Sequence, residues 1–267
     1  MIEYLNLLSN IYYKGEDRED RTGTGIRSLF GSQIEVDLGN GFPLLTTKRV
    51  HFKSIVYELL WMLKGDTNIK YLNDNGVTIW NEWADDNGDL GPIYGYQWRN
   101  VGKRFLAHGI DQIGELVDGL KNNPLSRRHV VSSWNPVYNK AMKLPPCHAL
   151  FQVFVSRDLQ HMDLKLYQRS CDFFLGGPFN IASYALLLEM LCHVTKRTPR
   201  RLIISYGDVH LYKNHLSQAR EQMVRKCKPL PNISLNDDIK DIFKFGYEDI
   251  VLSDYSPHSK ISAKVSV

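Results

Sequence analysis

Two short segments, 144–148 and 168–172, contain residues that could form a covalent bond to an anionic molecule. The prolines before Cys147 fix the backbone and lack N–H donors, so we expect its thiol at a rigid start of the alternating apolar run 149–155. A guanidinium near a thiol favours the nucleophilic thiolate, and Arg169 is the candidate. The pattern predicts a cysteine nucleophile. A half-buried cysteine that opens a strand explains the local sequence equally well.

The charge pattern favours a small anionic ligand over a nucleic acid. The 267 residues carry a formal net charge of +4, and the basic residues are interspersed with acidic ones. No basic stripe of the kind that binds nucleic acid is visible. RNA binding is therefore compatible with the sequence but not indicated by it.

The cysteines and the apolar runs predict a cytoplasmic protein. The cysteines show no C-x-x-C pair and no metal-ligand spacing, so we expect neither disulfides nor a bound metal; they are Cys147, Cys171, Cys192 and Cys227. No apolar run approaches the roughly 20 residues that cross a bilayer, and the first residues lack the blocks of a signal peptide. We expect no membrane contact.

Helical and strand patterns alternate along the chain and predict an α/β (α+β) protein with a large mixed sheet. Amphipathic or apolar helices are expected over 51–64, 110–120 and 181–194, and the last is apolar on nearly every side, as in a central core helix. Strands are expected over 129–133, 149–155, 162–167, 202–205 and 248–252. No repeat or linker divides the chain, so residues 1–267 are expected to form one domain.

A polar segment over 81–109, rich in glycine and tryptophan, is expected to be irregular. Long irregular segments often carry function, and Trp80, Trp83 and Trp98 could contact a flat aromatic ligand. A surface excursion that the tryptophans attach to the core is the alternative.

The chain resembles the thymidylate synthases over nearly its whole length. The resemblance rests on the segments around Cys147 and Arg169 and on further motifs in the same order; these are 20–25, 41–44, 46–49, 58–61, 65–68, 89–92, 94–95, 126–128, 175–182 and 207–212. It implies a thymidylate synthase-like fold with helices around a central apolar helix. It also implies a homodimer that converts dUMP to dTMP, with 5,10-methylenetetrahydrofolate donating a carbon and a hydride and leaving as dihydrofolate.

The resemblance assigns roles to the candidate catalytic residues. It implies that Cys147 adds to C6 of the uracil ring, because C5 becomes nucleophilic only after that addition. Glu58 would relay protons, and Tyr94 and His148 would belong to the same water network. The residues implied as catalytic are Cys147, Glu58, Tyr94, Asn180, His148 and Arg169.

The resemblance also implies a set of dUMP ligands, drawn from both subunits of the dimer. Arginine forks suit a phosphate, and an Asn carboxamide satisfies both O4 and N3–H of uracil, whereas an acid would suit cytosine. Arg127 and Arg128 would reach across the dimer interface into the partner's site. The implied ligands are Arg21, Arg127, Arg128, Arg169, Ser170, Asp172, Asn180, His210 and Tyr212.

For the folate, the resemblance implies an apolar and aromatic wall, a hydrogen bond from the pterin to Asp172 and a contact between Lys48 and the glutamate tail. The carboxyl-terminal residues would close over the ligands. The residues concerned are Lys48, His51, Ile79, Trp80, Trp83, Asp172, Leu175, Gly176, Phe179 and Val265.

Two positions depart from the usual family pattern, and other functions stay open. Tyr206 stands where a glycine is usual and could crowd the sugar, and Lys264 makes the tail more polar. A tail that admits water would give a deoxyuridylate hydroxymethylase with the same nucleophile, although Trp80 and Val267 favour hydride transfer. A catalytically silent nucleotide- or RNA-binding homologue is the third reading. A cysteine phosphatase is excluded because Val153 stands where its arginine is needed.

Overall fold

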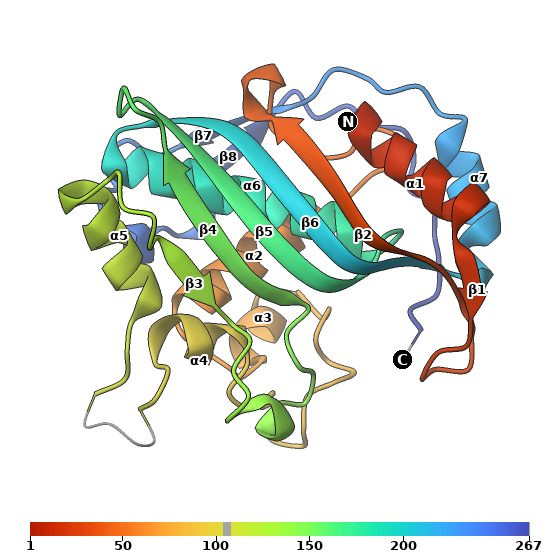
Figure 1. Ribbon diagram of the computed structural model, residues 1–267, viewed down its shortest axis with the longest axis horizontal. Coiled ribbons are helices and arrows are strands. Elements are labelled where there is room, and N and C mark those ends of the chain that lie inside the picture. The colour runs from red at the N-terminus through yellow and green to blue at the C-terminus, as the bar shows by residue number, and fades with distance from the viewer. Residues whose placement is uncertain (104–107, 267) are drawn as a thin grey trace.

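A twisted mixed sheet forms the front of the molecule in Figure 1, which shows a computed structural model that describes residues 1–103 and 108–266. Within these ranges six strands pair in the order β1-β2-β6-β5-β4-β3, and all neighbours are antiparallel except β5 and β6. Their bounds are β1 Glu16–Arg18, β2 Ile26–Asp37, β3 Val130–Ser132, β4 His148–Val155, β5 His161–Asp172 and β6 Thr198–Tyr212. Two further strands, β7 Asn232–Leu235 and β8 Ile250–Ser253, form a separate hairpin-like sheet.

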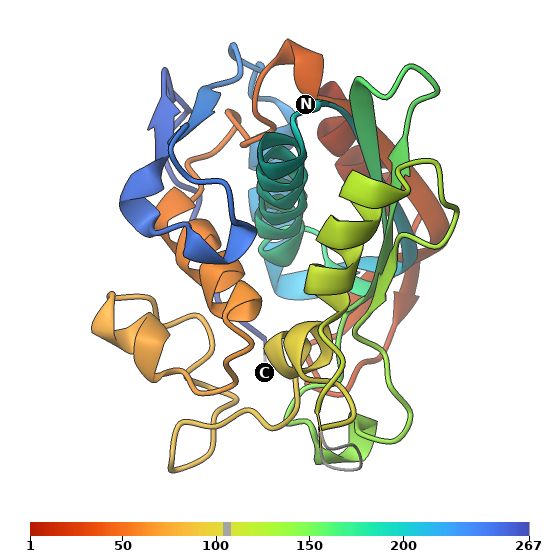
Figure 2. The same ribbon diagram turned by 90° about the vertical axis from the view of Figure 1, so that its left-hand side faces the viewer.

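The helices lie on one face of the large sheet and leave the other face open (Figure 2). In the described ranges the α-helices are α1 Ile2–Lys14, α2 Phe52–Leu63, α3 Lys70–Asp74, α4 Tyr94–Arg99, α5 Gln112–Asn122, α6 Gly176–Thr195 and α7 Leu216–Met223. Short 3₁₀ helices cover Leu38–Asn40, Asn139–Ala141, Lys213–His215, Ile242–Lys244 and Tyr247–Asp249. No helix in the described part of the chain is long and apolar enough to cross a membrane.

Helix α6 is the centre of the core and links β5 to β6. Most of its residues are buried on every side, so it lies between the sheet and helix α2. A helix that connects two parallel neighbours packs back onto their sheet, which allows β5 and β6 to pair in parallel. Its first turn begins four residues after β5 ends, and this places Asn180 beside the end of that strand.

The predicted mixed α/β fold with a central helix is confirmed. The three expected helices correspond to α2, α5 and α6, and four of the expected strands lie in the large sheet as β3 to β6. The expected strand at 248–252 is β8, which belongs to the small sheet instead. Helix α5 begins after Ile110, which is 41% exposed and forms a bridge to Val101.

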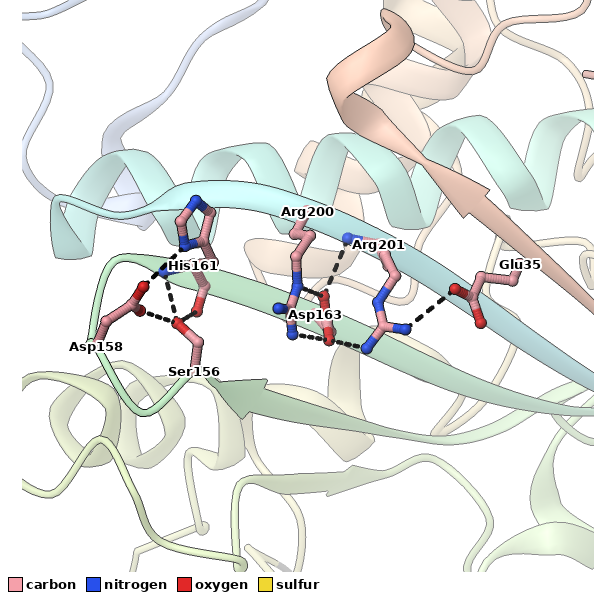
Figure 3. Close-up of polar contacts among 7 residues, drawn as sticks. All are labelled: Glu35, Ser156, Asp158, His161, Asp163, Arg200 and Arg201. Atoms are coloured by element: carbon pink, nitrogen blue, oxygen red, sulfur yellow. Dashed lines mark hydrogen bonds and ion pairs between the residues drawn. The ribbon is translucent and has the colours of Figure 1, made fainter.

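The end of the sheet that carries β5's first residues is held by a charged network (Figure 3). The buried carboxylate of Asp163 accepts hydrogen bonds from the guanidinium groups of Arg200 and Arg201, with N···O distances between 2.6 and 2.8 Å. Arg201 also reaches Glu35 on β2, at 3.1 Å. Burial opposes ionisation of Asp163, but the two arginines outweigh it and lower the pKa of its carboxyl. The network therefore joins β2, β5 and β6 through one ionised side chain.

Candidate active site

Cys147 lies immediately before β4, where two other elements hold it. The backbone N–H of Cys147 donates to the hydroxyl of Tyr94 on α4, at 2.8 Å, and its carbonyl accepts from the N–H of Arg169 on β5, at 2.9 Å. The guanidinium of Arg169 donates to the carbonyls of Pro145 and Pro146, at 2.7 and 2.9 Å. The two segments that first suggested a nucleophile are thus side by side, as the sequence predicted.

Two opposing effects act on the Cys147 thiol. Burial raises the pKa of the thiol, and the nearby Arg169 lowers it, with a net increase above its ordinary value. Arg169 therefore favours the thiolate, as the sequence predicted, but burial outweighs its effect on the pKa of the thiol.

A buried carboxyl group is connected to the nucleophile through Trp80 and Tyr94. Glu58 on α2 is 7% exposed, and its Oε1 accepts from the indole N–H of Trp80 at 2.7 Å. Burial raises the pKa of Glu58 to about 7, although the Trp80 hydrogen bond opposes the shift. The ring of Trp80 contacts Trp83 and Tyr94, at centroid distances of 5.7 and 6.1 Å. A carboxyl that can gain and lose a proton near neutral pH is suited to general acid–base catalysis.

His148 and Asn180 are neighbours on the other side of Tyr94 from Trp80. The His148 ring lies 5.1 Å from that of Tyr94, and its Nδ1 is buried without a hydrogen-bond partner in the described protein. Burial lowers the pKa of His148 to about 4, against the effect of the neighbouring Asn180, so the imidazole is neutral at pH 7. Oδ1 of Asn180 accepts a hydrogen bond from Nε2 of Gln168, at 2.8 Å. The carboxamide of Asn180 is therefore held in one orientation at the start of α6.

The ends of β5 and β6 bring the remaining polar candidates together. Ser170 pairs with Asp208 and Asp172 pairs with His210 in the parallel register, and the rings of His210 and Tyr212 lie 5.3 Å apart. Burial raises the pKa of Tyr212, and the charges of Asp172, Asp20 and Cys147 add to the increase while Arg21 opposes it. The loop that carries Arg21 is closed by Asp20, which accepts from the N–H groups of Thr22 and Gly25. Arg21 itself is exposed and borders this cluster.

The family comparison agrees with this geometry. The sequence model of one protein family, described as thymidylate synthase, matches residues 2–267. The chain belongs to the thymidylate synthase family. This match confirms the predicted family and fold and supports a methyltransferase that uses methylenetetrahydrofolate as co-substrate. No group of three potential metal ligands occurs in the described residues.

The residues that thymidylate synthases would use for folate form two groups in the structure. Asp172 is partly exposed, and its Oδ1 accepts from the N–H groups of Phe174 and Leu175. Leu175, Gly176 and Phe179 follow at the start of α6, and Trp80 and Trp83 form the second group with their ring contact. Ile79 is partly buried, whereas His51 and Val265 are exposed.

Lys48 lies below this surface and not on it. It is 5% exposed, and its ammonium donates to the Phe174 carbonyl at 2.5 Å and lies 3.4 Å from the centre of the Phe174 ring. Burial lowers the pKa of Lys48 to about 7, while Asp172 opposes the shift. Its ammonium supports the turn that follows Asp172, so a contact with a folate tail would require it to move.

Arg127 and Arg128 are far from Cys147 of the same chain. They precede β3, and the register of β3 on β4 pairs Val130 with Gln152. Continuation of that register places Arg128 about seven residues along β4 from Cys147, which is roughly 23 Å at 3.3 Å per residue. No side chain spans that distance. Both arginines are exposed.

Sequence reasoning missed several neighbours of the site. Gln168 holds Asn180, and the ring of Tyr184 packs against that of His148 at 5.3 Å. His215 lies 3.8 Å from Asp172. Of these residues, Gln168 could have been recognised from the sequence. It is a buried amide next to Arg169, on a strand face that is otherwise apolar. Tyr206 is fully buried against Phe173 and does not crowd the sugar side.

Proposed function

We propose that this protein is a single-domain enzyme that converts dUMP to dTMP, with 5,10-methylenetetrahydrofolate as donor of the carbon and the hydride. The observation that carries the proposal is a set of contacts centred on Tyr94, which holds the Cys147 backbone. Through Trp80 these contacts reach the proton-exchanging Glu58, and through His148 they reach the oriented Asn180. The match of the family model over residues 2–267 supports it.

In the proposed reaction Cys147 adds to C6 of the uracil ring. The addition converts C5 into an enolate carbon that can attack the methylene of the folate, so one difficult substitution becomes several easier steps. Arg169 stabilises the developing thiolate and, together with Arg21 and Ser170, offers donors to the phosphate. His210 and Tyr212 would hold the sugar hydroxyl, since their rings share one side of β6.

Proton transfer falls to the buried groups beside the nucleophile. Glu58, whose pKa is raised to about 7, can protonate and deprotonate the pyrimidine O4 through water near neutral pH. Tyr94 is within hydrogen-bond distance of the Cys147 backbone and can assist removal of the C5 proton. The aromatic wall of Trp80 and Trp83 excludes water, which favours hydride transfer to the exocyclic methylene over addition of hydroxide.

Asn180 supports uridylate as the substrate. Its carboxamide can donate to O4 and accept from N3–H, and Gln168 fixes its orientation. Cytosine presents the opposite pattern, and the mismatch would leave buried polar groups unpaired at about 1–3 kcal/mol each.

We further propose a cytoplasmic homodimer that forms through the open face of the sheet. That face exposes large apolar side chains, including Phe30 at 84% and Phe154 at 58%. A second copy that covered it would bring its own Arg127 and Arg128 toward this chain's phosphate site, which they cannot reach in their own subunit. The four cysteines are free, as expected in a reducing compartment.

The product of the reaction with dUMP and methylenetetrahydrofolate tests the proposal. We expect one dTMP and one dihydrofolate for each dUMP consumed, measured by mass analysis of the nucleotide and by the absorbance of dihydrofolate. If the products are instead a hydroxymethylated nucleotide and tetrahydrofolate, the enzyme is a hydroxymethylase and the proposed methylation is wrong. Nucleotide binding without any product would indicate a silent homologue.

A further inference from the structure

His215 is a fully buried histidine that lies between the carboxyl-terminal tail and Asp172, an expected ligand residue. Its Nε2 lies 2.7 Å from the carbonyl oxygen of Lys264, in the tail. Its Nδ1 is buried, has no hydrogen-bond partner in the described protein and lies 3.8 Å from Oδ1 of Asp172. One imidazole therefore contacts two parts of the chain that are 92 residues apart, as the numbers 172 and 264 give.

The carbonyl of Lys264 decides the tautomer of His215. A carbonyl oxygen can only accept, so Nε2 must carry the hydrogen, and in the neutral ring Nδ1 is then an acceptor that faces a carboxylate. The hydrogen bond to the tail and the orientation of the ring toward Asp172 are thus two consequences of one arrangement.

The segment around His215 holds the tail at a second point and also borders the sugar site. The side-chain amide of Asn214 donates to the hydroxyl of Ser266 at 3.4 Å. The His215 ring packs against Tyr212 at a centroid distance of 5.7 Å and against Phe174 at 5.5 Å. The tail up to Ser266 is therefore attached to residues beside both the expected sugar ligand and the expected pterin ligand.

We propose that His215 is a positioning residue that holds the carboxyl-terminal tail beside Asp172, on the expected folate side of the site. This inference rests on the proposed function for its substrates, but its geometry is independent of them. The Nε2–H donates to the tail, so its loss frees the tail. Residues 264–266 then close less tightly over a ligand at Asp172, and water reaches the reacting carbon more easily.

Two substitutions of His215 distinguish the role of Nε2 from that of Nδ1. In His215→Gln the terminal amide reaches the position of Nε2 and can still donate to Lys264, whereas in His215→Asn the shorter amide reaches only the position of Nδ1. His193→Asn is the matched control, because the Nε2 of His193 is likewise 2.9 Å from a carbonyl oxygen, that of Ile239, away from the tail.

We expect His215→Asn to raise the KM for methylenetetrahydrofolate about tenfold, with kcat and the KM for dUMP changed by less than about threefold. The dihydrofolate formed per dUMP consumed should fall, because addition of water to the exocyclic methylene leaves tetrahydrofolate. Carboxypeptidase should remove the last residues about tenfold faster. His215→Gln should return all three values to within about threefold of the unsubstituted protein.

Equal KM and equal tail cleavage in His215→Asn and His193→Asn would overturn the inference. If His215→Asn does not fold, the ¹⁵N chemical shifts of His215 in the unsubstituted protein decide, since a ring protonated on Nδ1 alone contradicts the bond to Lys264. If the unsubstituted protein forms no dTMP, the proposed function fails, while the comparison of tail cleavage still decides the role of His215.

Discussion

Strands β5 and β6 have opposite electrostatic designs at their two ends. At one end the buried carboxylate of Asp163 is satisfied by two arginines, which keep it ionised (Figure 3). At the other end burial moves the pKa of the Glu58 carboxyl to about 7. Nδ1 of His148 and Oε1 of Gln168 are buried there without partners, as Nε of Arg201 is at the first end. The contrast teaches that the first end is built for stability and the second for proton exchange and ligand binding.

Replacement of the nucleophile at the catalytic end should cause the largest loss of activity. We expect Cys147→Ala to reduce dTMP formation by about 10⁴-fold or more, because without the sulfur no adduct forms at C6. Binding of dUMP, measured by calorimetry, should survive. Cys227→Ala, at an exposed cysteine, is the control and should retain full activity. Substantial turnover by Cys147→Ala would contradict the covalent mechanism.

Replacement of the proton-exchanging carboxyl should lower activity next. We expect Glu58→Gln to decrease kcat by about 10²- to 10³-fold, since the amide keeps an acceptor for the indole of Trp80 but cannot transfer a proton. Steady-state rates at pH 7 measure the effect. A kcat within threefold of the unsubstituted enzyme would remove Glu58 from the reaction.

Glu58→Gln should increase the stability of the fold at high pH, although it lowers activity. Burial raises the pKa of Glu58 from 4.5 to about 7, so the stability that depends on its protonation is complete below pH 4.5 and is lost as the pH rises through about 7. Glu58→Gln removes this loss, on the order of 3 kcal/mol. The melting temperature should therefore increase relative to the unsubstituted protein at pH 8 but not at pH 4, and equal differences at both values would refute this account.

A substitution at the charged end of the sheet should lower stability and leave activity almost unchanged. We expect Asp163→Asn to lower the free energy of unfolding by about 3 kcal/mol at pH 7, because two arginines lose their buried partner, while kcat changes less than twofold. The pKa of Asp163 is lowered, so its contribution is present above the unfolded-state pKa and disappears as the pH falls through the folded-state value. Denaturant melts at pH 7 and pH 3 measure the difference. The exposed Glu35→Gln is the control and should cost less than about 1 kcal/mol.

The sequence revealed more of the catalytic end than of the charged end. The helix around Glu58 and the strand after Cys147 follow from apolar periodicity, and the motifs of the family identified the nucleophile. The pairing of Asp163 with Arg200 and Arg201 depends on the register of a parallel pair across helix α6, which local patterns do not encode. Strand β2 was missed for a related reason, since its outer residues are a mixture of apolar and polar types on an open face.

Protonation states were also beyond the sequence. Glu58 is ordinary as a helix residue, and only its burial beneath Trp80 raises its pKa. The same holds for the pKa of the Cys147 thiol. The nearby Arg169 suggested a lowered pKa, but burial outweighs its effect. His215 carried no signal, because its partner Lys264 acts through its backbone carbonyl.

The smallest expected effect concerns the choice of base. In Asn180→Asp the new carboxylate can still accept from Gln168, so the side chain keeps its place, but it no longer donates to O4 of uracil and instead can accept from the amino group of cytosine. We expect the ratio of kcat/KM for dUMP to that for dCMP to fall about 10- to 100-fold, which corresponds to about 1–3 kcal/mol. Asn180→Ala, which offers neither a donor nor an acceptor, is the control and should weaken dUMP without improving dCMP. If Asn180→Asp keeps the original ratio, the base is selected elsewhere in the pocket and not by the amide that Gln168 orients.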